Sequence, residues 1–231
     1  MNNPFNFFEK IYYINPDFNL DKRVVLEEEF SKYNILAERL PGFSLSLEQS
    51  ETITKNGGIL DKIPGTLPYL AAVRGITLGH LQAIFLAKYQ KFKNVLIFED
   101  DVMFSDNILE DLSNCVEDLK GREWDLFFLG CNPVENFHQV TDHISKPGGI
   151  YMSHAYVVNH TFYDTILDFD FSRCWVFDQH VFGLAKNPKH KCFMSTKHLA
   201  KQRPGFSGSV GNVVDYNVGV DHNYKINFRP L

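Results

Sequence analysis

The sequence has little cysteine, and none of it lies in a C-x-x-C pair. The 231 residues contain four cysteines: Cys115, Cys131, Cys174 and Cys192. Cysteines this sparse do not form a disulfide scaffold, so we expect reduced, mostly buried thiols in a cytosolic protein. The N-terminus carries neither a basic segment nor a long apolar one, so we expect no secretory signal.

The chain also lacks an uninterrupted apolar run of the about 18 residues that suggest a membrane span. Its longest apolar stretch, 69–87, is broken by Arg74, His80 and Gln82, so we expect no transmembrane helix. Basic residues are outnumbered, because 23 Lys and Arg against 28 Asp and Glu give a formal charge of −5. An acidic chain has little with which to neutralise phosphates, so we expect no nucleic-acid partner.

What the chain does have is enough apolar material for a sizeable core. Hydrophobic residues make up 44% of the sequence, with 21 Phe, 10 Tyr and 2 Trp, which excludes disordered and fibrous classes. We find no internal repeat, low-complexity tract or linker, so a single domain of this length is the simplest organisation.

Strand-like and helical patterns alternate along the chain. We expect strands over 10–15, 39–46, 94–98, 124–129, 150–159 and 192–195, and helices over 21–30, 77–92, 105–119, 161–169 and 178–185. Residues 49–68 and the tail from Pro204 are rich in loop-forming residues. This alternation predicts an α/β fold with a mixed, largely parallel sheet flanked by helices. Ligands of such sheets bind at the carboxyl ends of strands, which would bring together Asn15, Glu99 to Asp101 and Gly130.

Three consecutive carboxylates, Glu99, Asp100 and Asp101, follow directly on the apolar strand 94–98. Like charges packed together cost free energy unless a cation lies nearby. In an extended chain, residues two apart face the same side, so we expect Glu99 and Asp101 to share a ligand while Asp100 faces elsewhere. Carboxylates with room for water and phosphate suit Mg²⁺ or Mn²⁺. The alternative is a solvated strand end that also caps the next helix.

Around this cluster the sequence resembles glycosyltransferase family 25, which includes lipopolysaccharide-synthesis transferases and collagen galactosyltransferases. The similar segments occur in family order over roughly residues 10 to 209: Ile11–Asn15 with Asp21-Lys22-Arg23, Gly75–Leu81, Val95–Val102, Gly149–Val158, Phe177-Asp178 and His198–Ser207. The chain departs from the family pattern at Val73, Ile76, Gly79 and Gln179. These departures bear on substrate identity more than on reaction type.

The resemblance implies a GT-A-type fold in a single domain spanning 1–231, with a nucleotide-binding half at about 1–130 and an acceptor-binding half at about 131–231. It implies a metal-dependent, inverting transfer of a hexose, with a UDP-hexose as the expected donor. The acceptor would be a glycan, a lipopolysaccharide or a glycoprotein, and Mn²⁺ or Mg²⁺ would grip the diphosphate. We expect a cytoplasmic location, with peripheral contact to a membrane face left open.

The resemblance also assigns the central roles. Glu99, Asp101 and His198 are expected to hold the metal, with Asp101 as the direct ligand; for His198 the alternative is a surface histidine in a Lys-rich segment. Asp178, set among aromatic and apolar neighbours that would raise its pKa, is the expected base that takes the proton of the acceptor hydroxyl. The alternative for Asp178 is the N-cap of the helix over 178–185.

Contacts to the nucleotide are assigned to Tyr13, Asn15, Arg23, Asp100 and Gln202. A solvated helix face is the alternative for Arg23, and His80 is expected to be a hydrogen-bonded structural histidine. The glycine-containing segment 198–212 is expected to be loosely held and to order over the donor, or else to be a permanently packed tail. Two rival functions stay open: a sugar-nucleotide hydrolase or phosphotransferase, and a catalytically silent nucleotide-sugar-binding protein.

Overall fold

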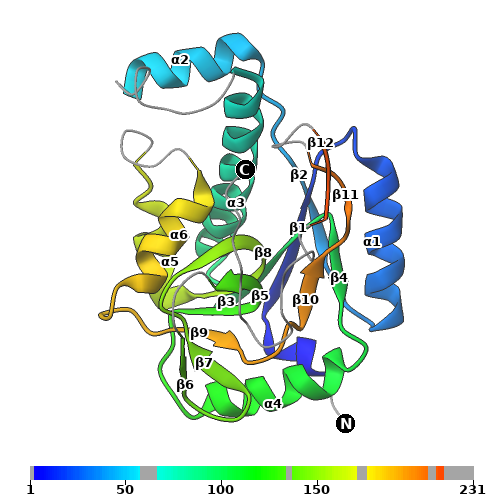
Figure 1. Cartoon of the computed structure of the whole chain (residues 1–231), viewed down its shortest axis with the longest axis vertical. Helices are drawn as coiled ribbons and strands as arrows, with labels where there is room; N and C mark the ends of the chain where they lie inside the picture. Colours follow the sequence, from blue (N-terminus) through cyan, green and yellow to red (C-terminus); the bar gives the residue numbers. More distant parts are fainter. Residues whose placement is uncertain (1–2, 58–66, 134–136, 171–175, 208–211, 216–231) are drawn as a thin grey trace.

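The structure, a computed structural model, describes residues 3–57, 67–133, 137–170, 176–207 and 212–215 (Figure 1). An eight-stranded sheet of order β2-β1-β3-β8-β5-β9-β7-β6 forms its centre. The strands are β1 (Lys10–Asn15), β2 (Glu38–Pro41), β3 (Asn94–Glu99), β5 (Leu126–Pro133), β6 (His138–Gln139), β7 (Ile144–Lys146), β8 (Ile150–Asn159) and β9 (Cys192–Ser195). Two small sheets pair β4 (Val102–Phe104) with β10 (Ala200–Gln202) and β11 (Gly205–Ser207) with β12 (Asn212–Val214).

The helices lie on both faces of the large sheet, which confirms the expected α/β class. They are η1 (Pro4–Phe7), α1 (Leu20–Lys32), α2 (Leu47–Gly57), α3 (Leu67–Tyr89), α4 (Ile108–Lys120), η2 (His160–Phe162), α5 (Tyr163–Leu167) and α6 (Phe177–Lys186). The sheet is mixed, and its parallel pairings are β1 with β2, β1 with β3 and β5 with β9. Strand β8 runs antiparallel to both β3 and β5, so the parallel character is confined to part of the sheet.

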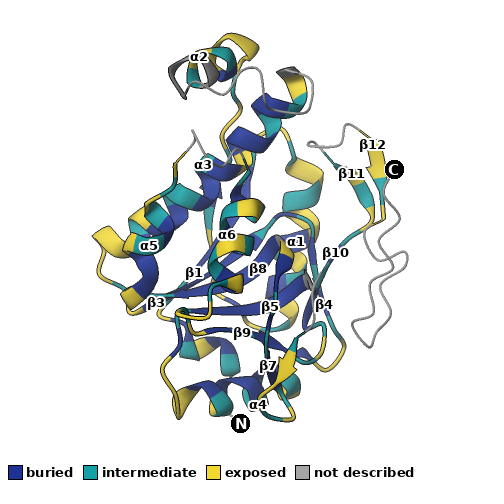
Figure 2. Cartoon of the chain, turned by 60° about the vertical axis from the view of Figure 1, so that its left-hand side comes forward, coloured by how far each residue is buried: buried dark blue, intermediate teal, exposed yellow. Residues whose placement is uncertain are grey.

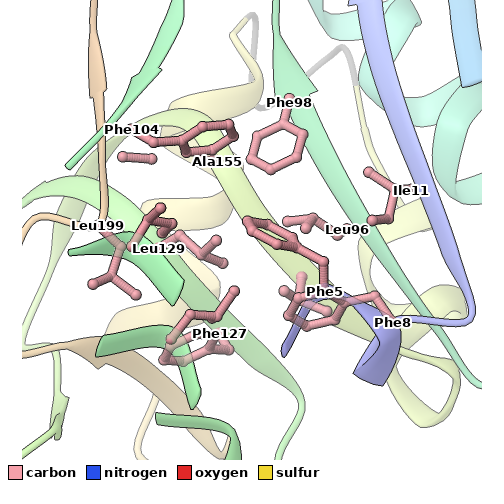
Figure 3. Close-up of a cluster of buried hydrophobic side chains, with 14 of the residues drawn as sticks. Phe5, Phe8, Ile11, Leu96, Phe98, Phe104, Phe127, Leu129, Ala155 and Leu199 are labelled. Atoms are coloured by element: carbon pink, nitrogen blue, oxygen red, sulfur yellow. The ribbon is translucent and has the colours of Figure 1, made fainter. Parts of the chain in front are cut away.

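Alternation along the central strands builds a core on each face. In β3, Leu96 and Phe98 enter the core beneath η1, α1 and α4, whereas Val95 and Ile97 enter the core beneath α3, α5 and α6. Figure 3 shows the first core, which is rich in phenylalanine. A strand buried on both faces needs apolar residues without alternation, and this is the pattern that the sequence shows over 94–98.

Helix α3 is longer than the expected helix over 77–92, because it begins at Leu67. Its part Pro68–Tyr89 is the single segment of the described chain that is long and apolar enough to cross a membrane, and 61% of its apolar window is buried inside the fold. Arg74 and His80, which interrupt the apolar run in the sequence, are buried as well. Figure 2 shows much of this helix as buried, and its Ala83, Ile84 and Ala87 belong to the core on one face of the sheet. This position requires apolar residues without any membrane.

Two glycines let neighbouring segments approach α3 closely. A Cβ added at Gly75 would lie 2.3 Å from the carbonyl oxygen of Phe43, and one at Gly79 would lie 2.9 Å from Cγ2 of Ile14. The loop after β2 and the end of β1 therefore rest directly on this helix. The glycines of the segment that resembles the family motif thus have a packing reason.

The expected surface loop over 49–68 is wrong in its first part, since Leu47–Gly57 form helix α2, while 58–66 lie outside the described residues. The helix start has a capping box that the sequence already contained. The Ser46 backbone N–H donates to Gln49 Oε1 at 2.8 Å, and the Gln49 N–H donates to Ser46 Oγ at 3.1 Å. Arg74 of α3, buried against α2, donates to Ser50 Oγ at 2.8 Å and ties the two helices together.

Part of the segment expected to be loosely held is instead a buried strand. Ala200–Gln202 form β10, which pairs with β4 and places Gln202 opposite Val102. Ala200 is fully buried, and Gly130 of β5 makes room for it, because a Cβ at that glycine would collide with the Ala200 carbonyl oxygen. Residues 208–211 of the same segment lie outside the described residues.

The prediction of buried, unpaired thiols holds for the three cysteines that the structure describes. Cys115, Cys131 and Cys192 are free and buried, and burial raises the pKa of each thiol to about 12. Cys174 lies outside the described residues.

Candidate active site

A cleft of about 940 Å³ opens where the carboxyl ends of β1, β2 and β3 meet the first turns of α1, α3 and α6. Its floor carries Glu99, Asp100 and Asp101, as the rule for parallel strands predicts. Four aromatic side chains with substantial exposure line it as well: Phe18, Phe43, Tyr151 and Phe206. Gly130, expected at the same crevice, is instead packed beneath β10 and does not line the cleft.

The three acids do not continue as an extended strand. Strand β3 ends at Glu99, and Asp100 and Asp101 form a tight turn into β4. The expectation that Asp100 faces elsewhere is therefore wrong, because the turn abolishes the two-residue alternation and brings all three acids to the cleft. We call Asp100 and Asp101 the acid turn.

A lysine from α1 lies against the acid turn. Lys22 Nζ is 3.5 Å from Asp100 Oδ1 and 3.5 Å from Asp101 Oδ2. No local pattern predicts this pair, since 79 positions separate Lys22 from Asp101. An ammonium group thus already occupies the place at which the two carboxylates converge.

Two asparagine side chains hold the Asp100 carboxylate through hydrogen bonds. Its Oδ2 accepts hydrogen bonds from Asn15 Nδ2 at 2.9 Å and from Asn19 Nδ2 at 3.0 Å. Arg39 Nε in turn donates to Asn15 Oδ1 at 3.1 Å. Burial raises the pKa of Asp100, while Lys22 and the two amides act to lower it. Asn15, predicted to touch the nucleotide, is buried and holds the acid turn in place instead of lining the cleft.

Glu99 faces a second group of side chains. Its Oε1 lies 3.4 Å from Nε2 of the buried His80 and 3.5 Å from Ser153 Oγ. Burial, followed by the charges of Asp101 and Asp178, raises the pKa of Glu99 to about 8. Burial also lowers the pKa of His80 to about 4. At neutral pH the imidazole is therefore neutral and the Glu99 carboxyl group largely keeps its proton.

His80 has the structural bonds expected of it and one further contact. Its ring stacks on Phe177 with centroids 4.5 Å apart, and its Nδ1 lies 3.0 Å from the Tyr156 hydroxyl oxygen. Its Nε2 has no hydrogen-bond partner among the described residues, although it faces Glu99. His80 is therefore a structural histidine that also lines the cleft and faces one of its acids.

Asp178 lies in the first turn of α6 and lines the cleft, but it does not cap that helix. Val176 is the N-cap residue, and Asp178 Oδ1 accepts a hydrogen bond from Ser153 Oγ at 2.6 Å. Ser153 thus stands between two carboxyl groups, those of Glu99 and Asp178. The capping alternative is wrong because the helix begins one residue earlier than the sequence pattern indicated.

Two of the predicted nucleotide contacts lie away from the cleft. Tyr13 packs edge-on against Phe30 in the core beneath α1, and its hydroxyl bonds to Glu27. Arg23 Nε donates to the same Glu27 carboxylate at 2.9 Å on the outer side of α1. Successive helix residues point about 100° apart, so Lys22 enters the cleft and its neighbour Arg23 does not.

Of the two C-terminal candidates, one reaches the acid turn. Gln202 lines the cleft, and its Nε2 lies 3.5 Å from Asp101 Oδ1, while the Arg203 N–H donates to the Asp101 carbonyl oxygen at 2.6 Å. His198 precedes β10 and does not line the cleft, because the β10 register runs away from the acid turn toward Phe104. The structure therefore brings Gln202, but not His198, to Asp101.

A divalent metal fits the donor chemistry of the acid turn. Such ions are commonly held by one or two carboxylates together with substrate phosphates, without a complete protein cage. Asp100 and Asp101 each turn one oxygen toward a shared cation, Lys22. No group of three or more His, Cys, Asp or Glu side chains in the described ranges is arranged to hold a metal. The protein ligands would thus be this pair, with the rest of the coordination left to substrate and water.

Comparison with known proteins does not identify the chain. No family model matches it, and no curated protein matches it. Among solved structures, A197 from STIV is similar at 10% identity with a TM-score of 0.45, over 89% of this chain and 93% of that one. A glycosyltransferase involved in the glycosylation of the major capsid of PBCV-1 is similar at 11% identity with a TM-score of 0.33, over 68% of this chain and 64% of that one. Likenesses this distant carry no argument about function.

Proposed function

We propose that the chain is a glycosyltransferase that moves a hexose from a nucleotide sugar to a carbohydrate-bearing acceptor. One observation carries the proposal. A single cleft at the strand ends holds both an acid turn suited to a cation and a diphosphate, and a separate carboxylate, Asp178, suited to accept a proton. These are the two functions that a single-displacement transfer requires.

The donor end of the cleft is assigned to the acid turn. A divalent ion such as Mn²⁺ or Mg²⁺ would neutralise the charge that gathers on the departing nucleoside diphosphate. Asp101 is the proposed direct ligand, with Asp100 Oδ1 beside it, because both oxygens already face one cation. Asn15 and Asn19 keep the Asp100 carboxylate in place, so that it is organised before the substrate arrives. Glu99, expected to share the metal, faces His80 and Ser153 and is not one of the two proposed direct ligands.

The acceptor end is assigned to Asp178 and Ser153. The Asp178 carboxylate takes the proton from the attacking acceptor hydroxyl as the new glycosidic bond forms. Ser153 holds the carboxylate through its hydrogen bond and fixes the direction from which the hydroxyl can approach. Tyr151 lies two residues earlier on β8, lines the cleft and stacks on Phe182 with centroids 5.2 Å apart. A rigid exposed ring of this kind is a suitable surface for a sugar ring.

The test is donor turnover by the purified protein. UDP-glucose and UDP-galactose are supplied with Mn²⁺, with and without a panel of saccharide acceptors, and released UDP is measured. UDP release that requires an acceptor supports the proposal. Release that is independent of acceptor indicates a hydrolase, and binding without release indicates a silent nucleotide-sugar-binding protein.

Loss of a proposed metal ligand and removal of the metal provide a second test. Asp101→Asn is expected to lower turnover roughly a hundredfold or more, the scale of losing a group that stabilises transition-state charge. Excess EDTA is expected to abolish turnover of the unaltered protein. Full activity in EDTA would contradict the metal assignment, while leaving the assignment of Asp178 to be judged on its own variant.

A further inference from the structure

Lys22 is the best-defined cation of the cleft. It lies in the first turn of α1, and its side chain is 24% exposed. Its two distances to carboxylate oxygens are equal, at 3.5 Å, so the ammonium group is shared between Asp100 and Asp101 and is not committed to either. Although burial acts to lower it, the charges of Asp101 and Asp100 hold the pKa of Lys22 above its ordinary value.

The remaining bonds of the acid turn leave one oxygen of each carboxylate to this lysine. Asp100 Oδ2 accepts from Asn15 and Asn19, and Asp101 Oδ1 faces Gln202. Asp100 Oδ1 and Asp101 Oδ2 face Lys22. A divalent cation seeking these oxygens would therefore have to enter at the position of the ammonium group.

The Lys22 ammonium group and a divalent metal cannot both occupy that position. A metal bound about 2.1 Å from carboxylate oxygens would lie within a few ångströms of the present Nζ position, where like charges repel strongly. The four-carbon stem of lysine lets the ammonium group move without any change in the backbone. A diphosphate entering the cleft would offer it new oxygens, since ammonium groups are ordinary phosphate partners.

A second feature indicates that this end of the cleft receives a ligand. His80, fully buried, directs an Nε2 atom without a hydrogen-bond partner in the described part of the chain toward Glu99, at 3.4 Å from Oε1. The acids, the lysine and this ring nitrogen all belong to one cleft. A buried polar atom of this kind calls for an explanation, and a ligand bound in the cleft would supply one.

We propose that Lys22 is an exchangeable internal cation. It neutralises the acid turn in the free protein, gives up the turn to a divalent cation, and moves onto the diphosphate of the nucleotide. This inference rests on the proposed function, because it requires a nucleoside diphosphate and a metal to bind in the cleft. It gives Lys22 a contact with the nucleotide of the kind that the family resemblance suggests for the neighbouring Arg23.

The variant Lys22→Met tests the exchange, since methionine keeps much of the side-chain length and removes the charge. Two quantities are measured by titration calorimetry: the affinity of the protein for Mn²⁺ alone, and its affinity for UDP at saturating Mn²⁺. We expect Mn²⁺ alone to bind about tenfold more tightly, because no ammonium group competes for the acid turn, and UDP to bind about tenfold more weakly. A residue with only a structural role would not move the two affinities in opposite directions.

Two further variants make the result decisive. Arg23→Met removes the adjacent charge, which pairs with Glu27 outside the cleft, and should leave both affinities within about twofold of the unaltered protein. Lys22→Arg keeps the charge and should bind Mn²⁺ alone like the unaltered protein, which also separates loss of charge from loss of folding.

Unchanged affinities in Lys22→Met would overturn the exchange and leave the proposed function standing. If the unaltered protein binds neither Mn²⁺ nor UDP, the exchange and the proposed function are both overturned. A lower Mn²⁺ affinity in Lys22→Met, with Lys22→Arg normal, would also overturn it, because it would make the lysine a support of the metal site and not a competitor.

Discussion

Ser153 donates a hydrogen bond to Asp178, with Oγ and Oδ1 2.6 Å apart, and so joins strand β8 to the first turn of helix α6. The same hydroxyl oxygen lies 3.5 Å from Glu99 Oε1. One small side chain therefore lies between the carboxyl group proposed as the base and one that keeps its proton at neutral pH. Strand, helix and acid cluster meet at this point of the cleft.

Replacement of the proposed base should separate binding from transfer. Asp178→Asn keeps the shape of the side chain but cannot take up a proton, so acceptor-dependent UDP release should fall roughly a hundredfold or more. The affinity for UDP with Mn²⁺ should stay within about threefold. Asp164→Asn, at a carboxylate 79% exposed on α5, is the matched control and should change neither quantity. A transfer rate within threefold in Asp178→Asn would place the base elsewhere.

Ser153→Ala should have a smaller effect of the same kind. The base remains, but its carboxylate loses the hydrogen bond that orients it, an interaction with a charged group worth about 1.5 to 3 kcal/mol. We expect transfer to fall by about tenfold with little change in donor affinity, measured with the same UDP-release assay. Ser153→Thr, which keeps the hydroxyl, should recover much of the rate, and failure to do so would point to crowding and not to orientation.

The raised pKa of Glu99 should appear in the pH dependence of stability. With a folded pKa of about 8 against an ordinary 4.5, the folded protein keeps a proton that the unfolded chain has released. Stability should therefore fall as pH rises through this window, by at most about 1.4 kcal/mol per pH unit. The lowered pKa of His80 acts in the opposite direction between about 4 and 6.5, so the fall should be clearest from 6.5 to 8.

Urea unfolding in EDTA at a series of pH values measures this dependence. Glu99→Gln, which cannot ionise, should lose the decline between pH 6.5 and 8 and should be more stable than the unaltered protein at pH 8. Parallel profiles for the two proteins would mean that Glu99 ionises normally in the fold.

Two helical glycines should respond to alanine in opposite directions. Gly75→Ala introduces a Cβ 2.3 Å from the Phe43 carbonyl oxygen, so we expect a loss of about 1 to 3 kcal/mol of unfolding free energy, the usual cost of overpacking. Gly183→Ala in α6 meets no atom within 4 Å and should add up to about 1 kcal/mol through helix propensity. Thermal or urea unfolding of both variants measures the difference, and equal effects would show that Gly75 is not a packing requirement.

The sequence was informative where local pattern decides structure. The apolar strand 94–98 and the amphipathic helix near 105–119 appear close to their expected places, because each buries residues at its own period. Helix α2 was missed although Ser46 and Gln49 form a capping box, since glycine and proline farther along dominated the pattern. Strands β4 and β10 are three residues long and exist only through their mutual pairing across about a hundred positions, which no local pattern records.

The sequence predicts which types of residue form the site better than it predicts their arrangement in space. Three acids after a buried strand correctly indicated the cleft floor, but the sequence does not show whether the strand continues or turns at Asp100. Lys22 and Ser153 were missed because each acts on an acid far away in the chain. The apolar helix face of His80 predicts a structural role, which its contact with the Tyr156 hydroxyl confirms, but it does not show that the second ring nitrogen faces Glu99.

Strand β8 lies between β3 and β5, although both of these precede it in the chain. During synthesis the ribosome therefore releases two central strands before the strand that joins them. Each of the two then offers an unpaired hydrogen-bonding edge, which is a template for aggregation. A fragment that stops near residue 130 would leave these edges permanently unpaired, so residues 1–130 are not expected to fold as a separate, soluble piece. The newly made chain should depend on chaperone protection until residues 150–159 have emerged.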